Sequence, residues 1–214
     1  MDRPGLIIEN LTKHHRNPRG REVTVLQGFA LDLEPSIAAV IHAPSGHGKT
    51  TLLRLIAGLE TPDQGAITFQ GKRLDKLPPA ARPIALLPQD APLWPHLTIK
   101  RNVTEAAAPN APPAAELLDQ LEVGAIADRK PHELSGGERR RAALASAIAT
   151  AAPLLLLDEP TAGLSGSART AVIRLIADQQ ATRLITTHDP SLSEELTGAI
   201  SVGLDPIKIQ TKKG

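Results

Sequence analysis

A nine-residue loop containing glycine constrains the fold of this chain more than any other stretch. It follows the apolar run 37–41, which reads as a buried parallel strand, and precedes residues 52–57, which read as a helix closed by Gly58. In such a unit the loop N–H groups and the positive end of the helix dipole face one anion. The loop therefore predicts a nucleoside triphosphate site, formed by Ala43, Pro44, Ser45, Gly46, His47, Gly48, Lys49, Thr50 and Thr51.

Individual residues of this loop supply the expected chemistry. Lys49 adds a positive charge for the β- and γ-phosphates, and the Thr50 hydroxyl is a ligand for Mg²⁺. Gly46 and Gly48 allow the backbone to approach a phosphate closely, because they carry no Cβ atom. Ala43 takes a position where the pattern has glycine, which fits the loop if its φ angle is negative.

A leucine run ends in two acidic residues. The run 154–157 reads as a buried strand, and its carboxyl end lies where open α/β sheets bind ligands. On its own, such a pair is as often solvated charge as a functional site. Beside a phosphate loop, we expect Asp158 to hold Mg²⁺ through its water shell. We expect Glu159 to polarise the water that attacks the γ-phosphate.

A second helix start has anion-binding character. Ser135, Gly136 and Gly137 precede Glu138 and a helical stretch, so N–H groups and a hydroxyl face outward. Two anion-binding helix starts and one nucleotide suggest a head-to-tail dimer, in which this segment completes the other copy's phosphate loop. The alternative is a simple helix cap. For the arginines at 139–141 we favour a solvated basic face.

Apolar strands alternate with helices through most of the chain, which favours an α/β fold with a mainly parallel sheet covered on both faces. Residues 14–22 read as a basic loop, and a small helical lobe is inserted after residue 88. The predicted strands are 6–11, 23–33, 37–41, 66–69, 84–87, 154–157 and 184–187. The predicted helices are 52–57, 99–108, 114–122, 136–150 and 167–180.

Composition excludes several classes of protein. A net charge of +1 leaves no electrostatic footprint for nucleic acid. No apolar stretch reaches the roughly 18–20 residues of a membrane-spanning helix. The chain has no cysteine, which excludes disulfides and thiolate metal sites and fits a reducing compartment. With so few aromatic residues, the core must be aliphatic.

The ordered motifs resemble those of nucleotide-binding subunits of ATP-binding cassette (ABC) transporters, most closely the small bacterial importer type. The resemblance covers nearly all 214 residues. It implies a P-loop NTPase core with a mainly parallel sheet, antiparallel β strands at the N-terminal side and an inserted helical subdomain. A single ATPase domain would have its core at 1–88 and 146–214 and its helical subdomain at about 89–145.

The resemblance also assigns roles to residues. The loop 43–51 matches Walker A, 154–159 matches Walker B, and 134–138 matches the signature. Gln89 corresponds to the glutamine that senses Mg²⁺ and the attacking water, and His188 to the switch histidine at the γ-phosphate. The implied catalytic residues are Glu159, His188 and Gln89. The implied metal-site residues are Thr50, Gln89 and Asp158. Besides the loop, the implied nucleotide contacts are Ser135, Gly136 and Gly137.

The resemblance fails at two positions. The family stacks an aromatic residue on adenine shortly after a lysine, but the loop after Lys13 contains no Phe, Tyr or Trp. We expect His15 to stack there, with His14 or Arg16 as alternatives, and we expect weak or unselective base binding. Ser165 replaces an aspartate, so it cannot carry the charge that couples the two sites.

These features predict an ATPase that uses ATP and Mg²⁺, forms a homodimer or pairs with a related ABC chain, and drives integral membrane permease subunits. A separate solute-binding protein is the expected further partner, and nucleic acid is not. The chain would be cytoplasmic, held peripherally on the inner face of the cell membrane by the permease. Residues 92–97, with Trp94 as an anchor or a packing residue, would receive a permease helix.

Two other functions fit the motifs less well. One is a nucleotide-gated switch protein with little turnover, which Ser165 and the absent aromatic favour. The other is a soluble cassette ATPase acting on DNA or ribosomes. Such proteins usually carry a long coiled coil or a second cassette, and this sequence has neither.

Overall fold

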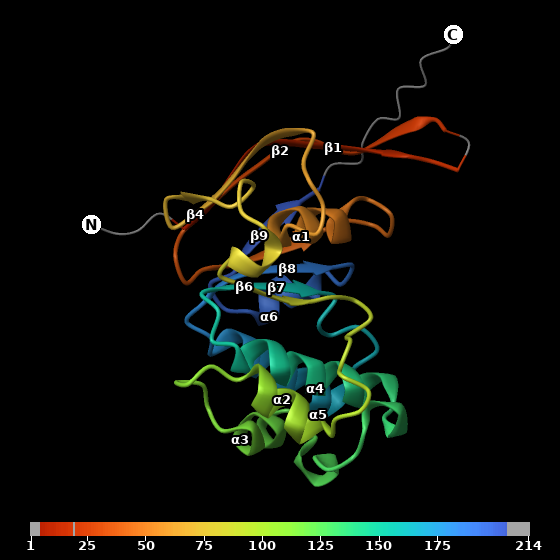
Figure 1. The fold of residues 1–214 in the computed structure, drawn as a ribbon, viewed down its shortest axis with the longest axis vertical. Coiled ribbons are helices and arrows are strands. Elements are labelled where there is room, and N and C mark those ends of the chain that lie inside the picture. The colour runs from red at the N-terminus through yellow and green to blue at the C-terminus, as the bar shows by residue number, and fades with distance from the viewer. Residues whose placement is uncertain (1–4, 19, 205–214) are drawn as a thin grey trace.

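The computed structural model describes residues 5–18 and 20–204, which form two sheets and a helical layer (Figure 1). The antiparallel sheet has the order β2-β1-β4-β5. Its strands are β1 (Leu6–Arg16), β2 (Glu22–Leu33), β4 (Gln64–Phe69) and β5 (Lys72–Arg73). The parallel sheet has the order β6-β7-β8-β3-β9. Its strands are β3 (Ala38–His42), β6 (Ile84–Leu87), β7 (Leu154–Asp158), β8 (Thr182–Thr187) and β9 (Ile200–Gly203). The predicted α/β class is confirmed.

Helices cover both faces of the parallel sheet. In Figure 1, α1 lies between the two sheets, and α2 to α5 lie below the parallel sheet. The α-helices are α1 (Lys49–Ala57), α2 (Ile99–Ala106), α3 (Ala114–Gln120), α4 (Gly136–Ala149), α5 (Gly166–Ala177) and α6 (Ser191–Glu195). Short 3₁₀ turns are η1 (Pro79–Ala81), η2 (Gly124–Ile126) and η3 (Pro131–Glu133). None of the helices in the described residues is long and apolar enough to cross a membrane.

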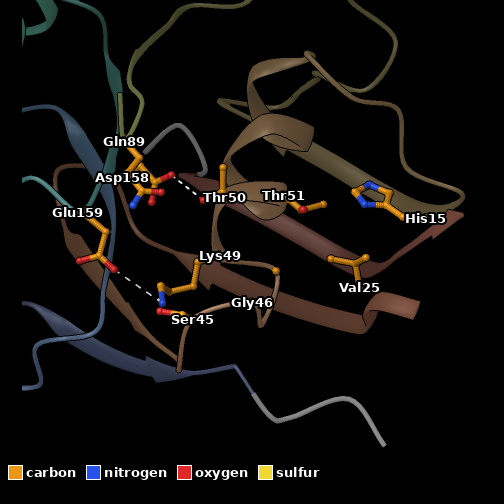
Figure 2. A pocket seen from close by; sticks show the side chains of 11 residues that line it. His15, Val25, Ser45, Gly46, Lys49, Thr50, Thr51, Gln89, Asp158 and Glu159 are labelled. Atoms are coloured by element: carbon orange, nitrogen blue, oxygen red, sulfur yellow. Dashed lines mark hydrogen bonds and ion pairs between the residues drawn. The ribbon is translucent and has the colours of Figure 1, made fainter. Parts of the chain in front are cut away.

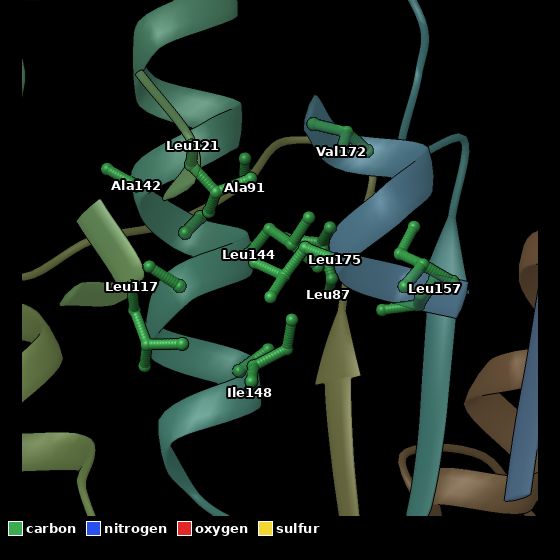
Figure 3. Packing of buried hydrophobic residues seen from close by; sticks show 14 of the residues in the cluster. Leu87, Ala91, Leu117, Leu121, Ala142, Leu144, Ile148, Leu157, Val172 and Leu175 are labelled. Carbon is green, nitrogen blue, oxygen red and sulfur yellow. The ribbon is translucent and has the colours of Figure 1, made fainter. Parts of the chain in front are cut away.

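The leucines of β7 divide the core into two clusters. Leu154 and Leu156 pack in the cluster that contains α1 and the antiparallel sheet. Leu155 and Leu157 pack in the cluster that contains α2 to α5, where Leu144 and Leu175 lie near the centre of the close-up (Figure 3). Successive side chains of a strand point to opposite faces, so an all-apolar strand must be covered on both.

The predicted basic loop at 14–22 is wrong in its extent. His14, His15 and Arg16 end β1, and Glu22 begins β2, so both ends of the predicted loop belong to strands. Arg16 is paired with Glu22 in the antiparallel register. Cross-strand pairing overrides the Pro and Gly signals here, because a hairpin needs them only at its tip.

Candidate active site

The carboxyl ends of three neighbouring strands build the site. β8 pairs with both β3 and β7, which brings the loop after His42 beside Asp158 and Thr187. A pocket of about 390 Å³ opens there (Figure 2). It is lined by His15, Val25, Ser45, Gly46, Gly48, Lys49, Thr50, Thr51, Gln89, Asp158 and Glu159.

The loop conformation depends on two glycines. Gly46 and Gly48 both have φ of +81°, a left-handed conformation that favours glycine. A Cβ atom on Gly48 would lie 2.7 Å from the Val25 carbonyl oxygen, so the loop packs directly against β2. At Gly48 the constraint therefore comes from β2 as well as from the backbone angle. Ala43 is not among the residues with positive φ, as its place in the loop requires.

Lys49 is a buried cation at the loop. Its Nζ atom donates to the carbonyl oxygens of Ala43 at 2.5 Å and Pro44 at 3.3 Å. The same nitrogen lies 3.7 Å from Oε1 of Glu159. The lysine is only 7% exposed, so its charge is little screened by water. Lys49 therefore places a positive charge at the loop, where it can bind a phosphate group, and Glu159 lies beside it.

Thr50 and Asp158 both line the pocket and contact each other directly. The Thr50 hydroxyl donates to Oδ2 of Asp158 at 2.7 Å, and the buried Thr186 hydroxyl donates to Oδ1 at 2.6 Å. Thr186 therefore orients the carboxylate from β8, a role that the sequence analysis missed. The sequence feature that could have indicated this role is the Thr186–Thr187 pair at the end of a buried strand.

Glu159 joins Lys49 to His188. Its Oε2 atom lies 2.9 Å from Nδ1 of His188 and accepts from the His188 backbone N–H at 3.4 Å. The backbone of Glu159 has φ of +53°, a conformation that costs about 1–3 kcal/mol for a residue with a side chain. Such an outlier, beside two polar partners, is typical of a functional site.

Gln89 lines the same pocket, and Arg140, which does not line it, binds the Gln89 backbone. The Arg140 guanidinium donates to the carbonyl oxygens of Gln89 at 2.9 Å and Glu159 at 2.6 Å. The predicted solvated basic face is therefore wrong, because all three arginines at 139–141 are half-buried. Arg140 precedes the buried Leu144 by one helical turn, and that spacing was the available signal.

Ser135, Gly136 and Gly137 lie outside this pocket in the described chain. Ser135 is the N-cap of α4. Its hydroxyl donates to Oε2 of Glu138 at 2.7 Å and accepts from the Glu138 N–H at 3.3 Å. The hydrogen bonds from Ser135 lower the pKa of the Glu138 carboxyl. Ser135 therefore caps α4, and one chain does not bring this segment to Lys49.

Three residues, His15, His14 and Arg16, were expected as candidates to stack on the adenine base. Of these, only His15 lines the pocket. Its Nε2 atom lies 2.9 Å from Oε2 of Glu60. His14 faces Asp63, whose Oδ2 accepts from the His14 backbone N–H at 2.6 Å. Val25 also lines the pocket. The sequence alone did not indicate this, because the direction in which the Val25 side chain points depends on how β2 pairs.

The segment after His188 is held by α5. The Arg169 guanidinium donates to Oδ2 of Asp189 at 2.7 Å and also to the Glu195 carboxylate. The hydrogen bond from Arg169 lowers the pKa of Asp189 to about 2. Ser165 is the N-cap of the same helix, and its side chain makes no capping hydrogen bond.

Comparison with known proteins gives one consistent result. A family model described as ABC transporter matches residues 26–162. An Fe(3+) ions import ATP-binding protein of Pseudomonas fluorescens is 42% identical over 180 residues, 78% of this chain and 51% of the relative. A thiamine import ATP-binding protein of a Chelativorans species is 37% identical over 183 residues, 80% of this chain and 74% of the relative.

The chain spans 51% to 60% of the length of the first Fe(3+) import relatives. A solved structure of a dimeric ATP-binding cassette, in a post-hydrolysis state bound to ADP and Pi, is similar over most of the chain. Its TM-score is 0.79 at 25% identity, with 92% of this chain and 94% of that chain covered.

Proposed function

The chain belongs to the ABC transporter family, and from that premise we propose that it is the ATP-hydrolysing subunit of a membrane transporter. The observation that carries the proposal is one pocket lined by a buried lysine, a Thr–Asp pair and Glu159, whose carboxylate is also contacted by His188 at 2.9 Å. These are the groups needed to bind a triphosphate and to activate water beside it.

Each group has a distinct task in this proposal. Lys49 and the loop N–H groups bind the β- and γ-phosphates. Glu159 orients the attacking water and accepts its proton, and His188 holds the Glu159 carboxylate in place and contacts the γ-phosphate. Gln89, which lies beside Asp158 in the pocket (Figure 2), completes the contacts to the water.

The Thr50–Asp158 pair fits a magnesium site. Both groups offer oxygen atoms, which Mg²⁺ prefers. Mg²⁺ usually keeps several waters and binds through one or two carboxylates and the substrate phosphates. When bound, Mg²⁺ would neutralise phosphate charge, with Thr50 as a ligand and Asp158 and Gln89 holding its waters.

The proposed base subsite lies between the hairpin and the loop. His15 takes the position of an aromatic residue, and its contact with Glu60 fixes the ring at the edge of the pocket. An imidazole ring offers less stacking area than an indole or phenol ring, so we expect modest selectivity for adenine.

The proposed assembly is a head-to-tail dimer on permease subunits. Ser135, Gly136 and Gly137 of one copy close the loop of the other, since they lie outside their own pocket. We propose a core at 1–88 and 146–214 and a helical subdomain at 89–145, although that boundary falls inside α4. The groove beside the half-exposed Trp94 receives a permease helix, which holds the chain on the cytoplasmic face.

The relatives support an importer. Two similar relatives are named for Fe(3+) and thiamine import, which supports permease subunits and a separate solute-binding protein as partners. Solute choice belongs to those chains, because the pocket described here contains only groups for a nucleotide.

Phosphate release by the purified chain and by Glu159→Gln tests the proposal. We expect the wild-type chain to hydrolyse ATP and the variant to lose about 100- to 10,000-fold in rate while still binding ATP. Glu116→Gln, on the exposed side of α3, is the control and should keep the wild-type rate. Slow wild-type turnover that Glu159→Gln leaves unchanged would indicate a nucleotide-gated switch instead.

A further inference from the structure

One guanidinium on α4 connects the two strand ends that carry Gln89 and Glu159. Arg140 Nη2 donates to the Gln89 carbonyl at 2.9 Å, and Nη1 donates to the Glu159 carbonyl at 2.6 Å. The same Nη1 lies 3.5 Å from the Asp158 carbonyl oxygen. Since β6 and β7 are hydrogen-bonded neighbours, a single planar side chain can reach both ends at once.

The Glu159 backbone needs an external support. Its φ of +53° is unfavourable for a residue with a side chain. Its own N–H donates to the Thr186 carbonyl at 3.0 Å, and its carbonyl accepts from the Ala162 N–H at 3.1 Å. Arg140 provides a second, charged donor to that carbonyl, which is stronger than a neutral one. Without it, the turn at 159–162 is free to relax.

We propose that Arg140 is a positioning residue, which sets the Glu159 carboxylate between Lys49 and His188 and the Gln89 side chain at the pocket. This inference rests on the proposed ATPase function. Arg140 itself does not line the pocket, so it acts through the two residues whose carbonyls it binds. Because Ser135 is the N-cap of α4, the same side chain also connects the second anion-binding helix start to both strand ends.

Two substitutions of Arg140 separate the effect of its hydrogen bonds on Glu159 and Gln89 from the effect of its packing in the fold. Arg140→Met keeps most of the apolar stem and removes every donor. Arg140→Lys keeps the charge, but an ammonium is a compact donor that cannot reproduce the guanidinium fork. Arg174→Met on α5 is the control, because Arg174 is exposed and its guanidinium has no partner in the described residues.

Steady-state ATP hydrolysis, ATP affinity and thermal unfolding are measured for all variants. We expect Arg140→Met to lower kcat by about 10- to 100-fold, the cost of misplacing a reacting group by an ångström. Arg140→Lys should recover part of that loss. The Kd for ATP should stay within about twofold of wild type in both, because Lys49 and its loop are unchanged. Arg174→Met should match wild type throughout.

A double variant tests whether Arg140 acts through Glu159 or independently of it. In the Glu159→Gln background, adding Arg140→Met should lower the residual rate by less than about threefold, because both changes disable one unit. The inference is overturned by an unchanged kcat in Arg140→Met, by additive losses, or by failure of both Arg140 variants to fold. A wild-type chain that binds ATP without turnover would overturn the proposed function, and this inference with it.

Discussion

At Glu159 and Lys49 the chain concentrates opposite charges in a poorly hydrated pocket. The two side chains are each 8% exposed, and their charged atoms lie 3.7 Å apart. The motifs alone predicted that these residues, Thr50 and Asp158 would meet, because strand ends and loops of a parallel sheet share one edge. Arg140 was predicted wrongly and Thr186 was missed, because their contacts depend on which strand lies beside which.

His15 gives a prediction at the residue scale. His15→Trp should tighten ATP binding, by at most about 5- to 150-fold, because stacking on a base is worth roughly 1–3 kcal/mol. His15→Ala should weaken it. Titration calorimetry with ATP and with inorganic tripolyphosphate checks this, since only the base contact should change. His14→Ala, which alters a side chain facing Asp63, is the control. Equal effects on both ligands would show that His15 does not meet the base.

At the scale of elements, buried arginines close the C-terminal ends of two helices. Arg82 donates to the carbonyls of Leu55 at 2.9 Å and Ile56 at 2.6 Å at the end of α1. Arg183 donates to the Ile176 carbonyl at 3.0 Å at the end of α5. Burial lowers the pKa of both guanidiniums, while the helix dipole favours their charge. The periodic pattern predicted these helices but not the side chains that cap them.

The contact between α5 and the segment after His188 predicts a pH dependence. The pKa of Asp189 is about 2 when folded, because Arg169 donates to it, and about 3.9 when unfolded. A lowered pKa stabilises the fold above pH 4, and that stability is lost as pH falls toward 2. Wild type should therefore be more stable than Asp189→Asn at pH 6, by about 1 kcal/mol or less given the partial exposure. The difference should shrink between pH 4 and pH 2.

Urea unfolding at several pH values measures this difference. Glu194→Gln is the matched control, because Glu194 is exposed on α6 and has no ion pair among the described residues. A difference between wild type and Asp189→Asn that stays constant from pH 6 to pH 2 would contradict the assigned contact.

On the scale of the whole molecule, the pocket and the Ser135 helix start are separate features of one chain. The residues that line the pocket come from β1 and β2, the loop with the start of α1, and the ends of β6 and β7, and none comes from residues 135–137. The layered α/β fold could be predicted because apolar runs and turn residues are local signals. The order of the strands and the hairpin length could not, since both depend on pairing between distant segments.

A crosslink between two copies tests the central claim most directly. The chain has no cysteine, so Ser45→Cys and Ser135→Cys can each be introduced alone, as near-isosteric changes, in the Glu159→Gln background. A short bis-maleimide reagent, which adds one cysteine thiol at each end, should join a mixture of the two variants into a dimer when ATP is present and much less without it. A mixture that stays uncrosslinked at saturating ATP would contradict a site shared between Lys49 of one copy and Ser135 of the other.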